Sequence, residues 1–490
     1  MNFRSKLLLL IMVAGLLSSC FTDRDDNGVF ASEINDFVWK GMNAVYLYKD
    51  FVPDLANDRF SSDEDYGDYL NSFDAPEDLF ESLIYMRPTV DKFSWIVDDY
   101  IALEQQFSGI TTSNGMDFGL RFVPGSSTEV YGYVRLVLPN SSASAQGVQR
   151  GDIFYAIDGT PLTEANFSSL LSSDTYNIDL ATYDNNGTPQ TDDDSIVPGT
   201  ESISLTKEPY TENPVFLTDI IDVAGENVGY LMYNGFTSTF NTQLNTAFGN
   251  FVNNNVQHLV LDLRYNPGGS VNTSILLSSM ITGQFTGEIY STEQWNSDLQ
   301  QQFMDQDPES LINRFTDNDD GAPLNSLNLN TVYILTTGSS ASASELVINC
   351  LNPYIDVVQI GTTTTGKYQA SVTIYDSPNF GRNDANPNHT YAMQPLVLKS
   401  LNSVGFTDYD NGLAPDITLE EDISNLGVLG DVNEPLLAAA LDEIAGLSRS
   451  TINFIEPVEL LGDNNNFVPF SKEMYIEKVI PESVKSKLQQ

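Results

Sequence analysis

Three short runs of aliphatic and β-branched residues constrain the fold of this chain more than any other feature. They are NVGYLMYN at 227–234, HLVLDLR at 258–264 and TVYILTT at 331–337. Continuous apolar runs of this length are typical of strands that are buried on both faces. Segments long enough for helices separate the runs. This order predicts an α/β core whose chemistry lies at the ends of its strands.

The length of the chain predicts several domains, because 490 residues exceed what one hydrophobic core usually supports. We expect a multidomain α+β protein that has an N-terminal helical region, a β-rich domain and the α/β core. The predicted units are a signal peptide at 1–19, a tether at 20–28, a helical domain at 29–112, a β-rich domain at 113–210, the core at 211–450 and a tail at 451–490.

Local patterns predict several elements in more detail. Apolar residues at helical spacing favour helices over 30–51 and 75–86 and near 90–106. The turn-rich, acidic stretch 184–200 is interpreted as a surface loop. A further helix is expected over 434–447, where Pro435 suits a first helical turn. The tail beyond 450 carries no recognisable functional signal.

The amino terminus has the pattern of an export signal. Basic Arg4 and Lys6 precede an apolar run and then the sequence LSSC, which ends at Cys20. LSSC resembles the lipobox of bacterial lipoproteins, and this resemblance implies that Cys20 is lipidated. The acidic TDRDD that follows resembles a surface-export signal of some Gram-negative bacteria. We therefore expect a lipoprotein anchored in the outer membrane, on the periplasmic side or at the cell surface.

Charge and cysteine content narrow the classes of partner. The formal net charge of −45 disfavours nucleic acid, because phosphates repel such a surface. The scattered acidic residues favour solubility, with divalent-cation binding as the alternative. Besides Cys20 the chain has only Cys350, so that no intramolecular disulfide can form once Cys20 is lipidated. Cys350 lies in an apolar run and is expected to be a buried, inert thiol.

Residues 115–162 alternate like strands and contain the segment RGDIFYAIDG at 150–159. With FGLR at 118–121 and a short helical SASAQGV at 142–148, this stretch resembles a PDZ domain. The resemblance implies that Phe118, Gly119, Leu120 and Arg121 bind the carboxyl end of a peptide, which adds a strand to the sheet edge. A small β-rich domain without peptide affinity is the alternative.

The segment GSSASASE at 338–345 precedes Lys367 by a spacing that suggests a Ser/Lys hydrolase. A serine hydroxyl needs a base to take its proton, and a lysine can be that base once burial lowers its pKa. The two histidines, His258 and His389, lie away from other catalytic signals, so a Ser-His-Asp triad is the weaker interpretation. Ser342 is the candidate nucleophile and is expected to open the helix ASELVINCL.

The strand end LDLRYNPGGS at 261–270 finishes in a tight two-glycine turn. Backbone amides in such a turn can stabilise the oxyanion of acyl transfer, and each donor contributes about 3 kcal/mol in the transition state. We expect Gly268 or Gly269 to provide one donor and the amide of Ala343 to provide the other.

Taken together, NPGG, SASASE and TxGK occur in the order that is typical of the carboxyl-terminal processing, or tail-specific, serine peptidases. The resemblance covers roughly residues 115–445. It implies that Ser342 is the nucleophile and Lys367 the base, and that Thr364 accepts a hydrogen bond from the amine. The family glutamine that orients the lysine is replaced here by Ser371, and Gln369 is the candidate substitute.

The sequence therefore predicts a Ser/Lys endopeptidase that needs no metal or organic cofactor. Its expected partners are proteins or peptides with free carboxyl termini, recruited through the PDZ-like domain, and the membrane that holds the lipid. Two alternatives remain open at this point. One is a catalytically silent peptide-binding scaffold, and the other is an esterase or amidase that acts on small substrates.

Overall fold

The structure is a computed structural model that describes residues 32–188, 190–191, 193–447, 460–464 and 472–477. The predicted signal peptide, Cys20 and the tether lie outside these residues, so the lipid anchor stays a prediction. Within the described ranges, no helix is long and apolar enough to cross a membrane.

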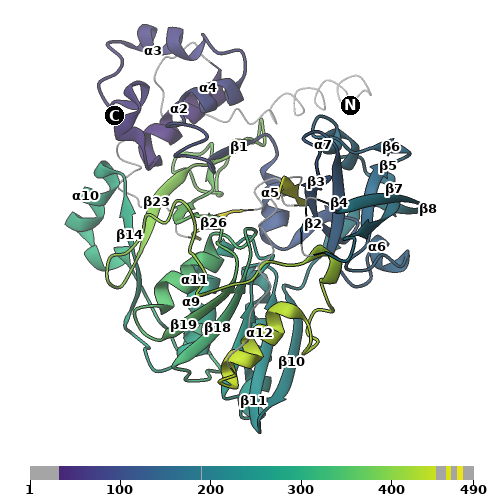
Figure 1. Ribbon diagram of the computed structural model, residues 1–490. Coiled ribbons are helices and arrows are strands. Elements are labelled where there is room, and N and C mark those ends of the chain that lie inside the picture. Colours follow the sequence, from purple (N-terminus) through teal and green to yellow (C-terminus); the bar gives the residue numbers. More distant parts are fainter. Residues whose placement is uncertain (1–31, 189, 192, 448–459, 465–471, 478–490) are drawn as a thin grey trace, which may run out of the picture.

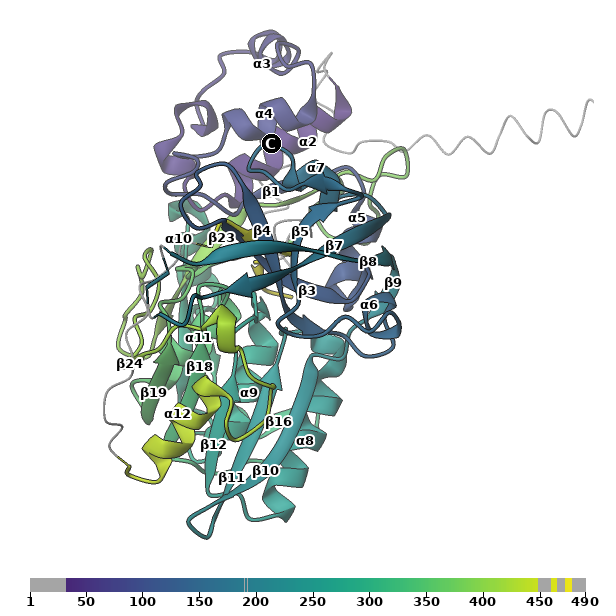
Figure 2. The same cartoon turned by 45° about the vertical axis from the view of Figure 1, so that its right-hand side comes forward.

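Three regions are arranged around the middle of the molecule. In Figure 1 the N-terminal helices α2 (Glu33–Val45), α3 (Asp63–Leu70) and α4 (Pro76–Ser82) lie at the top, the β-rich domain at the right and the α/β core below them. Figure 2 shows that the strands of the β-rich domain pass in front of the upper end of the core. The described elements thus correspond to the multidomain α+β architecture with an N-terminal helical region, a β-rich domain and an α/β core.

From residue 32 onward, the described part of the N-terminal region contains four helices of more than one turn. They are α2 (Glu33–Val45), α3 (Asp63–Leu70), α4 (Pro76–Ser82) and α5 (Tyr100–Phe107). The prediction of a helix near 90–106 is wrong over its first half, where β1 (Trp95–Val97) forms instead and pairs with β22 (Ala392–Gln394). The Asp99 side chain accepts from Ile101 N and Ala102 N and so fixes the start of α5.

The β-rich domain is built on one antiparallel sheet in the order β25-β3-β4-β5-β7-β8, with β6 paired to β5. Its elements are β3 (Met116–Phe122), β4 (Val130–Val137), α6 (Ser142–Ala145), β5 (Ile153–Ile157), β6 (Thr160–Pro161), α7 (Phe167–Leu171), β7 (Thr175–Asp184), β8 (Ser195–Thr206) and β25 (Gly462–Asp463). At its base, β2 (Ile110–Ser113) pairs with β9 (Glu208–Thr211), so both connections to the rest of the chain leave together.

The surface loop is shorter than its prediction over 184–200. Strand β8 begins at Ser195 and pairs with β7 in a long hairpin, because the alternating stretch that follows the acidic residues continues the ladder of β7. The segment between the two strands, 185–194, is the part of the predicted loop that remains outside them. Ladder pairing across the sheet outweighs the turn preference of the proline and glycine in β8.

The core contains the predicted buried strands. Its first sheet has the order β10-β11-β12-β18-β19-β24, and all neighbours are parallel except the β10–β11 hairpin. The strands are β10 (Val215–Val223), β11 (Glu226–Tyr233), β12 (His258–Asp262), β18 (Thr331–Thr336), β19 (Asp356–Gly361) and β24 (Ile417–Thr418). This arrangement confirms the α/β core and directs the carboxyl ends of the parallel strands to one edge.

Helices cover both faces of this sheet, which explains its continuous apolar strands. One face packs on α12 (Pro435–Ile444), which begins at the predicted proline. The other face packs on α8 (Asn241–Asn253), α9 (Val271–Thr282) and α11 (Ala343–Leu351). Figure 2 shows α12 and α8 on opposite sides of the strands. Cys350 is buried and free in α11, as expected, and burial raises the pKa of its thiol.

A second sheet lies at the carboxyl edge of the first and has the order β13-β26-β20-β23-β14-β15. Its strands are β13 (Gly269–Ser270), β26 (Met474–Tyr475), β20 (Gln369–Ser371), β23 (Leu396–Asn402), β14 (Ile289–Trp295) and β15 (Ile312–Arg314). The other described α-helices and strands are α10 (Ser297–Gln306), β16 (Asn318–Asp319), β17 (Ala322–Pro323) and β21 (Ile374–Tyr375). Strand β26 comes from the C-terminal tail and lies between two strands of the core.

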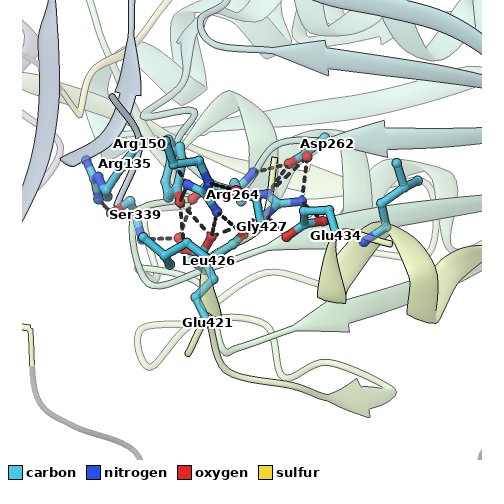
Figure 3. A network of polar contacts seen from close by, with 12 residues as sticks. Arg135, Arg150, Asp262, Arg264, Ser339, Glu421, Leu426, Gly427 and Glu434 are labelled. Carbon is cyan, nitrogen blue, oxygen red and sulfur yellow. Dashed lines mark hydrogen bonds and ion pairs between the residues drawn. The ribbon is translucent and has the colours of Figure 1, made fainter. Parts of the chain in front are cut away.

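A buried charge network joins the β-rich domain to the end of β12 (Figure 3). The fully buried Arg264 pairs with Asp262 at 2.8 Å and with Glu434 at 2.7 Å. Glu421 accepts from Arg264 and from Arg150 of the β-rich domain at 3.2 and 2.7 Å. Burial alone would raise the pKa of Glu421, but the two arginines lower it to about 2. The Glu421 carboxylate therefore stays charged, and its ion pairs with Arg264 and Arg150 link the two domains.

Replacing Arg264 by methionine should destabilise the protein strongly. The substitution leaves Asp262 and Glu434 buried without their counter-ion, which costs about 3–5 kcal/mol of unfolding free energy. Arg314→Met is the control, since Arg314 pairs with Glu309 at the exposed surface and its loss should have little effect. Chemical denaturation of the three proteins measures the difference. Equal stability of Arg264→Met and the parent would contradict the prediction.

Candidate active site

Ser342 stands at the amino end of α11, immediately after the loop that follows β18. It is fully buried and has φ 58° and ψ −115°, a backbone conformation that residues other than glycine rarely adopt. Such a conformation costs on the order of 1–3 kcal/mol and persists only where its surroundings enforce it. Ser342 therefore has a strained strand-to-helix geometry of the kind that is typical of nucleophilic serines.

The Glu345 carboxylate holds this conformation. It accepts hydrogen bonds from Ser342 N at 2.8 Å, from Gly366 N at 2.6 Å, from Lys367 N at 2.8 Å and from Thr364 Oγ1 at 2.5 Å. Burial raises the pKa of Glu345 to about 7, and these donors act against that shift. One carboxylate thus fixes both the serine turn and the loop that carries the lysine.

Lys367 is fully buried, and its ammonium group lies 4.8 Å from the ring centre of Phe93. Burial lowers its pKa from the ordinary lysine value of 10.5, while the nearby Glu473, Asp91 and Glu345 act in the opposite direction. The net lowering is what a lysine needs if it is to accept a proton.

Ser342 and Lys367 meet at one atom. Ser342 Oγ donates to the carbonyl oxygen of Lys472 at 2.7 Å, and Lys367 Nζ donates to the same oxygen at 2.9 Å. The two groups predicted from a spacing in sequence are therefore brought together in space. The residue that they share, Lys472, belongs to the C-terminal tail.

The two-glycine turn lies against Ser342, as expected. Gly268 has φ 108°, and a Cβ atom at this position would lie 2.4 Å from Ser342 Cβ and 3.0 Å from Ala343 N. Glycine is thus required at 268, where the turn must approach the helix end closely. Gly268 N donates to Asn266 Oδ1 at 2.9 Å, while Gly269 pairs with Met474 of β26.

Other predicted residues make different contacts from those expected. Gln369 Nε2 donates to Tyr48 Oη at 3.0 Å and not to Lys367. Thr364 Oγ1 donates to Glu345 and accepts from Leu413 N at 2.8 Å, so it positions the loop rather than the amine. Ser371, at the position of the family glutamine, donates to Glu473 Oε2 at 2.8 Å and thereby reaches the carboxylate that contacts Lys367.

The two histidines belong to other parts of the molecule. His258 Nε2 lies 2.7 Å from Glu226, and His389 Nε2 lies 2.9 Å from Asp376. Both pairs lie in the described region and neither involves Ser342, which agrees with the lower weight given to a Ser-His-Asp triad.

The predicted peptide-binding residues Phe118, Gly119, Leu120 and Arg121 lie within β3. Its outer edge is paired antiparallel with β25, where Gly462 lies opposite Leu120 and Asp463 opposite Gly119. The edge that was expected to take up a peptide strand therefore holds an extended segment of the same chain. Arg121 pairs with Glu420 at 2.9 Å and so points to the core.

A cavity of about 190 Å³ lies between the β-rich domain and the glycine turn. Apolar side chains of Phe107, Met116 and Leu138 line it together with Gly268 and the half-buried Glu212. Burial raises the pKa of Glu212 to about 7. The cavity thus lies beside the glycine turn and has a lining of apolar and polar groups.

Two contributors to the site were not predicted from the sequence. Glu345 stands three residues after Ser342, and the pattern Ser-x-x-Glu before an apolar run is a capping-box signal that could have identified it. Glu473 lies in the tail, 106 residues from Lys367, and no local pattern marks it.

An α/β sheet that presents a strained serine at a helix start, beside a two-glycine turn, is typical of serine hydrolases. Similarity to known protein families narrows the class of hydrolase. The model of peptidase family S41 matches residues 227–384, and the model of the peptidase S41 N-terminal domain matches residues 33–95. Over these residues the chain is similar to peptidase family S41.

Known proteins agree with this assignment. The chain is 25% identical over 241 residues to a carboxyl-terminal-processing protease of Picosynechococcus sp. and 25% identical over 334 residues to a chloroplastic C-terminal processing peptidase of Tetradesmus obliquus. The matches cover 48% and 66% of this chain and only 50% and 63% of the two relatives.

A crystal structure of a Bacteroides fragilis protein assigned to the S41 proteases is similar to this chain over most of its length. The two are 28% identical with a TM-score of 0.63, and the match covers 84% of this chain and 98% of the other. The similarity therefore extends well beyond residues 227–384.

Replacing Glu345 by glutamine should weaken both the fold and the site. The amide group would face backbone N–H donors in place of a carboxylate oxygen, and each unsatisfied buried donor costs about 1–3 kcal/mol. We expect a lower free energy of unfolding and a loss of any activity that depends on Ser342. Glu443→Gln, on the exposed side of α12, is the matched control. Denaturation curves that coincide for Glu345→Gln and Glu443→Gln would contradict this role.

Proposed function

We propose that this chain is a serine endopeptidase of the carboxyl-terminal processing type, in which Ser342 is the nucleophile and Lys367 the general base. The observation that carries the proposal is the convergence of Ser342 Oγ and Lys367 Nζ on one carbonyl oxygen, at 2.7 and 2.9 Å. Two buried donors that share one acceptor lie near each other, and release of that acceptor would allow Ser342 Oγ to donate to Lys367 Nζ after a small movement.

The proposed reaction has two halves. Lys367 takes the proton of Ser342 Oγ as this oxygen attacks the substrate carbonyl, and the ammonium then gives the proton to the leaving amine. Water next attacks the acyl-serine, and Lys367 again accepts and returns the proton. Burial lowers the pKa of Lys367, and this direction supports its role in both halves, because an exposed lysine would stay charged.

The negative charge that develops on the substrate oxygen needs donors. Ala343 N lies at the amino end of α11, where the helix dipole favours a negative charge. The turn of Gly268 and Gly269 supplies the other side, and the close approach of Gly268 to Ala343 N supports a shared oxyanion site. Gly268 N must leave Asn266 Oδ1 if it is to donate to the substrate.

We further propose that the β-rich domain acts as a PDZ-like module and recruits the carboxyl ends of protein substrates. The strand pairing at the β3 edge supports this role, since an extended segment is accommodated there by backbone contacts. The cavity beside Gly268 supports recognition of one substrate side chain near the cleaved bond. Chain-end recruitment distinguishes this function from a small-substrate esterase.

Cleavage of an unfolded protein with an apolar carboxyl terminus tests the dyad. We expect hydrolysis by the parent chain and its loss by at least a thousandfold in both Ser342→Ala and Lys367→Ala, because each change removes an essential step. Product masses from both halves of the substrate measure cleavage. Retained hydrolysis in either variant would contradict the proposed dyad, and binding of the substrate end without cleavage by the parent would favour a scaffold.

The rate should depend on pH through Lys367. Only the neutral amine accepts a proton, so kcat/KM should fall as pH drops through the pKa of Lys367, which burial holds below 10.5. The carboxyl groups of Glu473, Asp91 and Glu345 face this amine and oppose the shift. Initial rates on an unstructured peptide give the profile, with Ser342→Ala as the background control. A rate that is flat between about pH 6 and pH 10 would exclude a titrating base.

A further inference from the structure

The C-terminal tail lies in the site that the proposed function assigns to substrate. We propose that residues 460–464 and 472–477 are an internal inhibitor that fills the peptide-binding track of the same molecule, from the β3 edge to Ser342. This inference rests on the proposed function, because it concerns the regulation of the same site. Five contacts of the tail carry it.

The first is strand insertion. β26 runs parallel to both of its neighbours, with Met474 opposite Gly269 on β13 and Tyr475 opposite Ser371 on β20. Ile476 N donates to Ser371 O at 3.1 Å and continues the ladder. Without the tail, β20 would present an open edge next to Ser342. Addition of an extended strand to such an edge is a general way to bind a peptide.

The second is the orientation of the Lys472 carbonyl. In a complex ready for cleavage the carbonyl carbon faces the serine, and the carbonyl oxygen faces the oxyanion donors. Here the Lys472 oxygen instead accepts from both Ser342 Oγ and Lys367 Nζ. The oxygen takes up the hydrogen bonds through which the serine would be activated. The tail is therefore bound in an orientation that blocks reaction rather than one that leads to its cleavage.

The third is the carboxyl group of Glu473. It contacts Lys367 Nζ at 3.0 Å and accepts from Ser371 Oγ at 2.8 Å. A negative partner favours the ammonium form of Lys367, which cannot act as a base. Asp91 and Glu345 face the same amine and remain there when the tail leaves. Departure of the tail thus removes the charged group in direct contact with the amine and favours its neutral, active form.

The fourth is the anchoring of the tail by side chains. The Tyr475 ring stacks on Phe107, with 4.2 Å between ring centres and 21° between planes. Ser270 Oγ donates to Glu477 Oε1 at 2.6 Å, and Met474 is completely buried. An extended segment bound only by backbone pairing would be exchangeable with many others. These side-chain contacts give this particular segment a preference for the track.

The fifth is the second attachment, on the β-rich domain. Leu461 N donates to Leu120 O at 2.9 Å, and Asp463 accepts from Arg135 at 3.2 Å and from Ser339 Oγ at 2.7 Å. Two attachments on one chain raise the effective concentration of each. A substrate end that binds the β3 edge would displace this second attachment and so weaken the first, in which β26 pairs with β13 and β20. Substrate recruitment and release of inhibition would then be one exchange.

Tyr475→Ala tests this inference in the full chain. The change removes the ring that stacks on Phe107 while it leaves Ser342, Lys367 and their loops intact. The probe is a fluorescent peptide with the sequence of residues 460–477, and its binding is measured by anisotropy. We expect Tyr475→Ala to bind the probe at least tenfold more tightly than the parent, because its own tail vacates the track. Tyr391→Ala, a partly exposed tyrosine outside the site, is the control and should match the parent.

Activity measured on the same proteins separates the two proposals. Tighter probe binding together with faster hydrolysis of a substrate protein supports both. Tighter probe binding without hydrolysis by any form keeps the tail in the track and overturns the peptidase function. Equal probe binding by Tyr475→Ala and the parent overturns the inference, whether or not both hydrolyse the substrate.

A second variant covers the case in which Tyr475→Ala perturbs the fold. Glu473→Gln keeps the size of the side chain and the backbone of the tail but removes its charge. The Lys367 amine then loses a negative partner, which lowers its pKa. We therefore expect the fall of kcat/KM with decreasing pH to occur at a lower pH than in the parent. If kcat/KM falls at the same pH in Glu473→Gln and the parent, the role of Glu473 is overturned. If the tail came from a second copy of the chain, dilution would release it and the parent would bind more probe. That result would overturn inhibition within one chain.

Discussion

The site depends on the buried carboxylate of Glu345. Ser342 and Lys367 are 25 residues apart in sequence, and each lies outside the regular helices and strands. One backbone bond joins the two loops, in which Thr365 N donates to Ser340 O at 2.9 Å. Glu345 accepts from the amides of both loops and so fixes their separation. It also holds Ser342 at a positive φ that the chain would otherwise leave. Because water is excluded around it, these bonds are stronger than the same bonds at a surface, and the loss of any one of them is costly.

A second constraint links this site to the β-rich domain. Arg264 follows β12 and precedes the glycine turn by only a few residues, and the charge network around it includes Arg150 of the β-rich domain. Tyr265, next in the chain, donates to Glu421 at 2.6 Å and accepts from Arg150 at 2.7 Å. The position of the domain is therefore coupled to the backbone that leads into Gly268. A movement that separates Arg150 from Glu421 would leave buried charges unpaired, so the domain has a well-defined resting position.

Much of the fold could be predicted because its signals are local. The strands 227–234, 258–264 and 331–337 are short apolar runs, and the start of α11 follows from Ser342 as a cap. The orientation of Gln369 could not be predicted in this way. A register shift between Ala370 and Ser371 interrupts the pairing of β20 with β23, and such bulges redirect side chains. Strand β26 was missed for a related reason, since its neighbours Gly269 and Ser371 are both distant in sequence.

The buried amine of Lys367 explains why the track needs an occupant. An amine in an apolar site must have acceptors, and in the described state Lys472 O and Glu473 provide them. A substrate strand in place of β26 would bring its own carbonyl groups but not necessarily a carboxylate. The Lys367 amine would then lose its charged partner, Glu473, when the substrate peptide binds next to Ser342. On this reasoning, a single exchange of one strand for another both admits the substrate and makes Lys367 a base.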